Sequence, residues 1–266
     1  MEKSMKTLEG KTALVTGGAM GNGQGIAECL YAQGAQVALL DMSPVVFDTA
    51  KEIGTDVLAF QADITRPEEV RKCVQAILDK TGKLDILVNN AGIARFARFT
   101  EATDELRDLH LDVNVKGAWN CTKAVLPSML AQGWGRVINM SSVTGPYVAD
   151  PGEAAYATSK AALIGFTKAL AVEVAGRGIT VNALCPGYIL TPMVRHSAQE
   201  SNPANPQAVI DGIAAGIPMK KLGTPKNIGD LVAFLASDGA EYITGQAIVI
   251  DGGNMLPETN AMGLKG

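Results

Sequence analysis

The chain has 266 residues, 47% of them hydrophobic and 19% charged, with a formal net charge of -4 at pH 7. This length and apolar content predict a single domain over residues 1–266, because the chain is short for two full domains. The mild acidity and the lack of a long Lys/Arg run argue against nucleic-acid binding. The longest uncharged stretch, at 178–194, is interrupted by prolines and makes a poor membrane span.

The cysteines and histidines show no metal-binding or disulfide pattern. The cysteines are far apart and form no Cys-x-x-Cys pair, and we expect both histidines on the surface. These residues are Cys29, Cys73, Cys121, Cys185, His110 and His196. No apolar segment near the start is long enough for a secretory signal. We therefore expect a cytoplasmic protein with no metal site and no membrane partner.

The first predicted elements are a short buried strand at 11–16, a glycine-rich loop at 17–25 and an amphipathic helix at 26–33. Glycines in such a turn let the backbone approach a pyrophosphate without an intervening Cβ, and the helix N-terminus offers free N–H groups. This order indicates a dinucleotide site. By itself it is equally consistent with an ordinary tight turn between a strand and a helix.

The next predicted strand, at 36–40, ends in Asp41, which follows Gly23 by 18 residues. This is close to the spacing expected for a carboxylate that binds the hydroxyls of an adenosine ribose. The same carboxylate would repel a 2′-phosphate, and no nearby residue supplies a cation for one. The sequence therefore favours NAD over NADP, although Asp41 would also suit a helix cap or a turn before Pro44.

Strands and helices continue to alternate along the chain. Further strands are predicted at 57–61, 84–89, 135–140, 180–184 and 246–250, and helices at 67–80, 104–132, 156–175 and 226–237. This order predicts an α/β fold, a Rossmann-like doubly wound parallel sheet with helices on both faces. Ligands of such sheets bind at the carboxyl ends of the strands. The polar or glycine residues just after strands are Gly17, Asp41, Asp63, Asn90 and Ser142.

Two segments outside this alternation have their own character. Residues 193–220 are rich in Pro, Asn, Ser and Ala, with weak hydrophobic periodicity. We expect them to form a mobile lid over the crevice. Residues 254–266 form a tail, and no linker or internal repeat divides the chain before it.

Tyr156 and Lys160 lie four residues apart in an Ala-rich stretch that favours helix, so their side chains should share one face. A phenol is a poor base at neutral pH, but an adjacent ammonium lowers its pKa. Ser142, fourteen residues upstream, is placed to hold a substrate oxygen. The three residues form a candidate acid/base centre, although a bare Tyr–Lys pair on a helix is more often a surface feature.

Taken together and in order, these motifs resemble those of the short-chain dehydrogenase/reductase family over about residues 8–255. Three loops and four polar residues carry the resemblance. The loops are Thr16-Gly-x-x-x-Gly-x-Gly23, similar to the family's cofactor loop, Asn89-Asn-Ala-Gly92, similar to its fourth-strand turn, and Pro186-Gly187, similar to its nicotinamide-side loop. The family's catalytic tetrad falls on Asn114, Ser142, Tyr156 and Lys160.

The resemblance implies an NAD(P)-dependent oxidoreductase that interconverts a secondary alcohol or polyol and its ketone or aldehyde by hydride transfer. In this interpretation Tyr156 is the acid/base, while Lys160 lowers its pKa and binds the nicotinamide ribose. Ser142 orients the substrate oxygen, and Asn114 holds a water beside Lys160. The implied dinucleotide contacts are Gly17, Met20, Gly21, Asn22, Gly23, Asp41, Met42, Asp63, Ile64, Asn90, Ala91, Gly92, Tyr156, Lys160, Pro186, Gly187, Ile189 and Thr191.

The chain departs from the family pattern at two places. Asn22 occupies a position that is usually aliphatic, where its backbone N–H would still bind phosphate and its side chain would suit a helix cap. The spacing from Ser142 to Tyr156 is one residue longer than is common, which indicates an extra residue in the loop at 145–152. Because this loop borders the substrate, analogy is a weaker guide to the substrate.

Two other functions and two further features stay open. A sugar-nucleotide epimerase or dehydratase typically has a wider-spaced cofactor loop and a larger C-terminal domain, and a non-catalytic dinucleotide sensor typically lacks the Tyr or Lys. The helices at 104–132 and 156–175 carry apolar residues on more than one face, which predicts a homotetramer whose tail crosses between subunits. Arg95 and Arg98 either attract an anionic substrate or are simply exposed.

Overall fold

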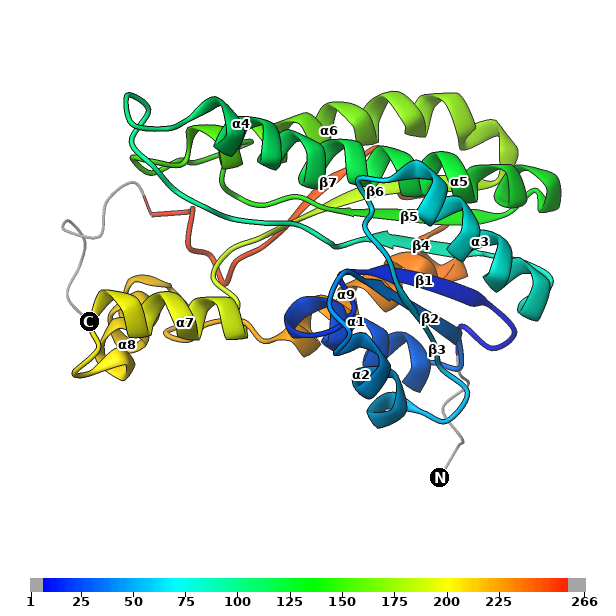
Figure 1. Ribbon diagram of the computed structural model, residues 1–266, viewed down its shortest axis with the longest axis horizontal. Coiled ribbons are helices and arrows are strands. Elements are labelled where there is room, and N and C mark those ends of the chain that lie inside the picture. The colour runs from blue at the N-terminus through cyan, green and yellow to red at the C-terminus, as the bar shows by residue number, and fades with distance from the viewer. Residues whose placement is uncertain (1–6, 258–266) are drawn as a thin grey trace.

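The computed structural model describes residues 7–257, which form a seven-stranded sheet with helices on both faces (Figure 1). Every neighbouring pair of strands is parallel, in the order β3-β2-β1-β4-β5-β6-β7. The strands are β1 (Thr12–Thr16), β2 (Gln36–Asp41), β3 (Leu58–Gln61), β4 (Ile86–Asn89), β5 (Gly135–Met140), β6 (Ile179–Pro186) and β7 (Ala247–Ile250). The predicted doubly wound parallel sheet is confirmed.

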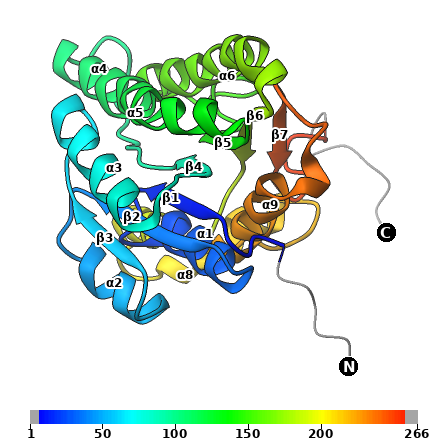
Figure 2. The same cartoon turned by 90° about the vertical axis from the view of Figure 1, so that its right-hand side faces the viewer.

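Helices cover the sheet in two layers. They are α1 (Gly21–Ala32), α2 (Val46–Ile53), α3 (Pro67–Thr81), α4 (Asp104–His110), the π-helix η1 (Leu111–Lys116), α5 (Gly117–Gln132), α6 (Ala154–Val174), α7 (Pro192–Ser201), α8 (Pro206–Gly216) and α9 (Pro225–Ala236), with 3-10 turns at Ala175–Arg177 and Asp238–Ala240. Helices α3, α5 and α6 lie on one face, and α1, α2 and α9 on the other (Figure 2).

Alternating side chains of the central strands supply both halves of the core. Val15 and Leu39 pack in the cluster that includes α1 and α9, whereas Leu14 and Leu40 pack in the cluster that includes α3 and α5. All four side chains are fully buried. Because both faces of a parallel sheet are covered, its central strands are rich in apolar residues, which is why the sequence pattern located them.

The single helix predicted at 104–132 is instead three segments, α4, η1 and α5. The π turn of η1 contains Asn114, which is buried. Such π segments are frequent at functional sites, and a hydrophobic pattern with helical spacing does not reveal one extra residue in a turn. Helix α2, only eight residues long, was not predicted either.

The segment predicted as an irregular lid, 193–220, contains α7 and α8, which share a small apolar cluster. Pro192 and Pro206 weakened the helical pattern, yet each stands in the first turn of a helix, where a missing N–H costs nothing. The preceding residues cap both helices: Thr191 Oγ accepts from Val194 N, and Asn205 Oδ1 accepts from Ala208 N.

Within residues 7–257, no helix is both long and apolar enough to cross a membrane. All four cysteines are free thiols. Of the predicted tail, 254–257 belong to the described part of the chain, and 258–266 lie outside it.

Candidate active site

A cleft of about 410 Å³ opens at the carboxyl ends of the strands. Fifteen of the predicted site residues line it: Gly17, Met20, Gly21, Asn22, Asp41, Asn90, Ala91, Gly92, Ser142, Tyr156, Lys160, Pro186, Gly187, Ile189 and Thr191. The cleft also has eight lining residues that were not among the predicted site residues, although the last two belong to the predicted lid: Ile93, Ala94, Met140, Ser141, Tyr188, Pro192, Met193 and Val194. Four of the eight directly neighbour predicted site residues in the sequence, namely Ile93, Ser141, Tyr188 and Pro192.

The glycine-rich loop is packed so closely at Gly17 and Gly23 that a Cβ would not fit at either position. Gly17 has a φ of +65°, and its N–H donates to Leu40 O at 2.8 Å. A Cβ on Gly23 would collide with the carbonyl oxygen of Gly17. Asn90 Nδ2 donates to the carbonyl oxygens of Thr16 and Gly17, at 3.0 and 3.1 Å. The loop is therefore fixed, with bare backbone toward the cleft.

The Asp41 carboxylate stands beside this loop at the end of β2. Its Oδ2 accepts from Ala19 N at 3.0 Å, and its Oδ1 accepts from Ser43 N at 2.8 Å. The bond to Ser43 N shows that Asp41 also stabilises the turn before Pro44, which was one of the alternatives. Each carboxylate oxygen keeps a further lone pair, and the residue lines the cleft, so it is also placed to accept hydroxyl donors.

Asn22 does not cap α1, contrary to our expectation. The helix begins at Gly21 after an extended Met20, and no side chain caps it. Asn22 Oδ1 is buried without a hydrogen-bond partner among residues 7–257. An unpaired buried acceptor is costly unless a ligand or water donates to it. The Asn22 oxygen, the exposed backbone of the glycine-rich loop and the Asp41 carboxylate together fit a dinucleotide.

Tyr156 and Lys160 project from α6 into the cleft, as their spacing predicted. Lys160 is buried, and its Nζ donates to Met140 O at 2.8 Å. Burial lowers the pKa of Lys160 to about 8, with a small opposing effect from Cys185. Ser142 Oγ accepts from Thr144 N at 3.1 Å.

The pKa of Tyr156 is raised rather than lowered. Burial is the largest cause, the Ser142 hydroxyl opposes it, and the Glu153 carboxylate adds to it. Lys160 Nζ lies 5.7 Å from the centre of the Tyr156 ring, and its hydrogen bond is to Met140. The expected lowering of the phenol pKa by Lys160 is therefore not seen in this geometry, where desolvation is the largest influence on the phenol.

Asn114 lies behind the cleft wall rather than in it. Its Oδ1 accepts from Ile93 N at 2.8 Å, and its Nδ2 donates to Ile93 O and to Ser159 Oγ, at 3.1 and 2.9 Å. A Cβ placed on Gly92 would lie 3.1 Å from Asn114 Oδ1 and 3.4 Å from Lys160 Nζ. Asn114 and Lys160 thus flank the same glycine of the β4 turn.

Four predicted dinucleotide contacts do not line the cleft: Gly23, Met42, Asp63 and Ile64. Gly23 lies inside the first turn of α1. The Asp63 carboxylate is directed to its own turn, where Oδ1 accepts from both N and Oγ of Thr65 at 2.8 Å. Ile64 is buried in the core cluster, and Met42 is exposed. Their roles as contacts remain predictions.

His110 was expected on the surface, and this expectation is wrong because its side chain is fully buried. The helical spacing Leu106, His110, Asn114 places it on the inward face of α4 and η1, a signal available in the sequence. His196 is exposed, as expected, and pairs with Glu200. Arg95 and Arg98 are both exposed.

A family model described as "Enoyl-(Acyl carrier protein) reductase" matches residues 17–254. A solved short-chain type dehydrogenase/reductase from Mycobacterium marinum superposes with a TM-score of 0.85 and 34% identity, covering 95% of this chain and 98% of that one. The chain belongs to the short-chain dehydrogenase/reductase family and is an NAD(P)-dependent oxidoreductase.

Two further proteins are similar to this chain along nearly its whole length. Oxidoreductase UcpA of Escherichia coli (strain K12) is 50% identical over 263 residues, which cover 98% of this chain and 100% of that protein. The ligand-free aldohexose dehydrogenase (AldT) of Thermoplasma acidophilum has a TM-score of 0.90 at 30% identity, covering 98% of this chain and 100% of that one. The chain is thus similar to UcpA proteins along nearly its whole length.

Proposed function

We propose that the enzyme interconverts a secondary alcohol or polyol and its ketone or aldehyde, with Tyr156 as the acid/base. The observation that carries this proposal is the meeting of Tyr156, Lys160 and Ser142 in one cleft with the glycine loop and Asp41. A proton-transfer group thus shares a cavity with residues that fit a dinucleotide. The bound dinucleotide would supply or accept the hydride.

The side chains divide the remaining work. In reduction, Tyr156 gives its phenolic proton to the carbonyl oxygen, and in oxidation it takes the proton back. The Ser142 hydroxyl donates a hydrogen bond to the same oxygen and fixes its position. Lys160 would bind the nicotinamide ribose, and Asn114 would hold a water beside it, since both groups flank Gly92.

Other substrates and functions are less well supported. The family description names an acyl-carrier-protein reductase, whereas the structural relative AldT is named for an aldohexose, which carries both hydroxyl and carbonyl groups. Against an epimerase or dehydratase, residues 7–257 contain no second substrate domain beyond the small α7–α8 unit. Against a non-catalytic sensor, both Tyr156 and Lys160 line the cleft.

The proposal is tested by measuring NADH and NADPH oxidation with a panel of ketones and aldehydes, including sugars, diketones and cyclic ketones. The reverse reaction is measured with the matching alcohols. We expect turnover with at least one secondary alcohol–ketone pair. Dinucleotide binding without turnover on the whole panel would favour the sensor.

We also propose that α7 and α8 act as a lid, that the enzyme works in the cytoplasm, and that residues 1–266 act as one domain. Pro192, Met193 and Val194 of α7 line the cleft, and the two helices pack mainly on each other, which suits movement as a unit. The four free thiols suit a reducing compartment.

Asp41 is proposed to select NAD(H) over NADP(H). A 2′-phosphate would be placed against a carboxylate that has no cationic partner among residues 7–257, at a cost of several kcal/mol. We expect Asp41→Asn, which keeps one oxygen acceptor but removes the charge, to lower the NADH/NADPH ratio of kcat/KM by about 10- to 100-fold. Initial rates give this ratio for the parent and for the variant. Thermal unfolding of both proteins checks whether losing the bond to Ala19 or Ser43 lowers stability. A parent enzyme that prefers NADPH would contradict this role.

A homotetramer is proposed from the apolar outer surface of α5 and α6. Trp119 is 55% and Val172 is 85% exposed, and the Trp119 ring packs against Phe166 with centroids 5.2 Å apart. Burying such a patch favours assembly. Light scattering should give the mass of four chains, and Val172→Glu should shift it to smaller species, whereas Val45→Glu, just before α2, should not. A monomeric parent at micromolar concentration would rule the tetramer out.

A further inference from the structure

We propose that His110 is a positioning residue that holds the catalytic Tyr156 in place through the segment at 93–97 and through its own ring. This inference rests on the proposed role of Tyr156. It comes from three contacts of a fully buried imidazole that the reaction itself does not use.

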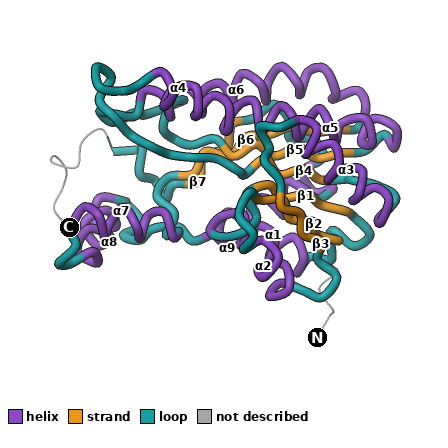
Figure 3. The backbone as a smooth tube through the Cα atoms, in the orientation of Figure 1, coloured by secondary structure: helices purple, strands orange, loops and turns teal. Residues whose placement is uncertain are grey.

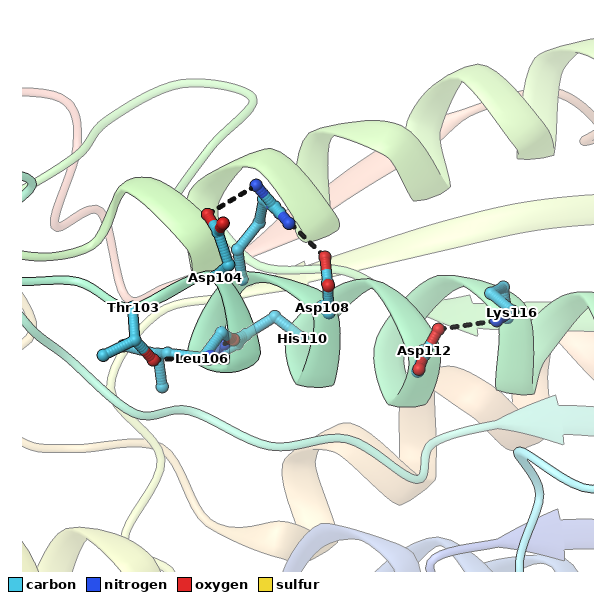
Figure 4. Close-up of polar contacts among 8 residues, drawn as sticks. Thr103, Asp104, Leu106, Asp108, His110, Asp112 and Lys116 are labelled. Atoms are coloured by element: carbon cyan, nitrogen blue, oxygen red, sulfur yellow. Dashed lines mark hydrogen bonds and ion pairs between the residues drawn. The ribbon is translucent and has the colours of Figure 1, made fainter.

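The two nitrogens of His110 have partners that permit one tautomer only. Nδ1 lies 2.8 Å from the carbonyl oxygen of Leu106, one turn earlier in α4 (Figure 4). Nε2 lies 3.1 Å from the backbone N of Arg95. A carbonyl only accepts and a backbone N–H only donates, so Nδ1 carries the proton and Nε2 is the acceptor. The ring is therefore neutral and fixed at both ends.

A long connection without helix or strand runs from β4 to α4 (Figure 3). His110 and Asn114 hold its first part. Asn114 Oδ1 accepts from Ile93 N, His110 Nε2 accepts from Arg95 N, and Gly152 O accepts from Ala97 N at 3.1 Å. In an extended chain the N–H groups of alternate residues point the same way. Two side chains and one carbonyl thus take the place of a neighbouring strand along the cleft edge.

This segment carries one half of an aromatic clamp on Tyr156. The Phe96 ring meets the Tyr156 ring edge-on at 5.9 Å and 89°, and the His110 ring meets it at 6.3 Å and 74°. Both are favourable edge-to-face geometries. Phe96 directly follows Arg95, so the bond from Arg95 N to His110 also fixes where Phe96 lies. His110 therefore positions Tyr156 in two ways: its own ring packs against the phenol, and its bond to Arg95 N fixes the segment that carries Phe96.

Two substitutions of His110 separate its hydrogen bond to Arg95 from its ring contact with Tyr156. His110→Phe keeps a ring but loses the acceptor, and leaves the Arg95 N–H without its partner. His110→Gln keeps an acceptor of similar reach but loses the ring. Phe96→Leu removes the other half of the clamp at a side chain that is 56% exposed, so folding is not at risk. Thr103→Ala is the matched control, since it removes the α4 cap to Leu106 N without touching Tyr156.

We expect His110→Phe to lower kcat by about 10- to 100-fold, as displaced catalytic groups do, with KM and dinucleotide Kd changed less than about threefold. His110→Gln and Phe96→Leu should fall between this variant and the parent, and Thr103→Ala should keep parental kcat. Parental kcat in His110→Phe, or an equal loss in Thr103→Ala, would overturn the proposal.

A second readout needs no turnover. The ultraviolet absorbance titration of tyrosine, taken as the difference from Tyr156→Phe, reports the ionisation of Tyr156 alone. Burial raises the pKa of Tyr156, so loosening the clamp in His110→Phe should let water in and lower that pKa toward its ordinary value. Glu153 and Lys160, the charged groups near the phenol, are the same in every variant. An unchanged titration would count against the clamp, whereas a parent inactive on every carbonyl would instead count against the proposed function.

Discussion

Replacing Tyr156 by Phe is expected to lower turnover by roughly 10²–10⁴-fold, the range for lost general acid/base catalysis. The substitution removes the only proposed proton donor but keeps the ring that packs against Phe96 and His110. The cleft therefore keeps its shape, and the dinucleotide should bind as in the parent. Stopped-assay turnover and a fluorescence titration of NADH binding measure the two effects separately.

The rates of alcohol oxidation and of carbonyl reduction should depend on pH in opposite ways. Oxidation needs the phenolate as base, so its rate should rise with pH toward the pKa of Tyr156, which burial raises. Reduction needs the protonated phenol and should fall over the same range. Tyr242→Phe, at a fully exposed tyrosine outside the cleft, is the matched control and should keep parental profiles. Near-parental turnover by Tyr156→Phe across the pH range would remove Tyr156 from the reaction.

Replacing Lys160 by Ala is expected to lower dinucleotide affinity as well as turnover, whereas Tyr156→Phe should lower turnover alone. In this geometry Lys160 does not lower the phenol pKa, so the pH dependence of any residual alcohol oxidation should stay close to that of the parent. The dinucleotide loses a proposed ribose contact, so its affinity should also fall. Activity profiles and NADH titrations on Lys160→Ala and Tyr156→Phe separate the two residues. Unchanged NADH affinity in Lys160→Ala would contradict the ribose contact.

A second variant, Lys160→Met, tests whether the loss of activity in Lys160→Ala comes from a folding defect. The pKa of Lys160 is lowered to about 8 by burial, so the folded state disfavours the ammonium. That destabilisation is fully present below about pH 8 and disappears as the pH rises from the folded pKa to the unfolded value near 10.5. Lys160→Met, which fills the same space without charge, should therefore be inactive yet more stable than the parent by on the order of 1–3 kcal/mol at pH 7. Thermal unfolding at pH 7 and pH 10 measures this difference, which should shrink at the higher pH.

Local patterns in the sequence determined much of the fold and the cleft. Short apolar stretches located the strands, and in the central strands these stretches are buried because both faces of the sheet are covered. The order of strands and helices then put Gly17, Asp41, Asn90 and Ser142 at one edge, since carboxyl ends of parallel strands meet there. The four-residue spacing brought Tyr156 and Lys160 together, because one helical turn separates them.

Tertiary packing decided what these patterns do not encode. The π turn around Asn114 and the burial of His110 depend on how α4 and η1 pack on α6 and on the segment at 93–97. The phenol pKa of Tyr156 likewise depends on desolvation by parts of the chain that are distant in sequence, and this desolvation is the largest cause of its rise. Spacing in a sequence reports which side chains can meet, whereas burial and hydrogen-bond partners depend on atoms that only the folded chain brings near.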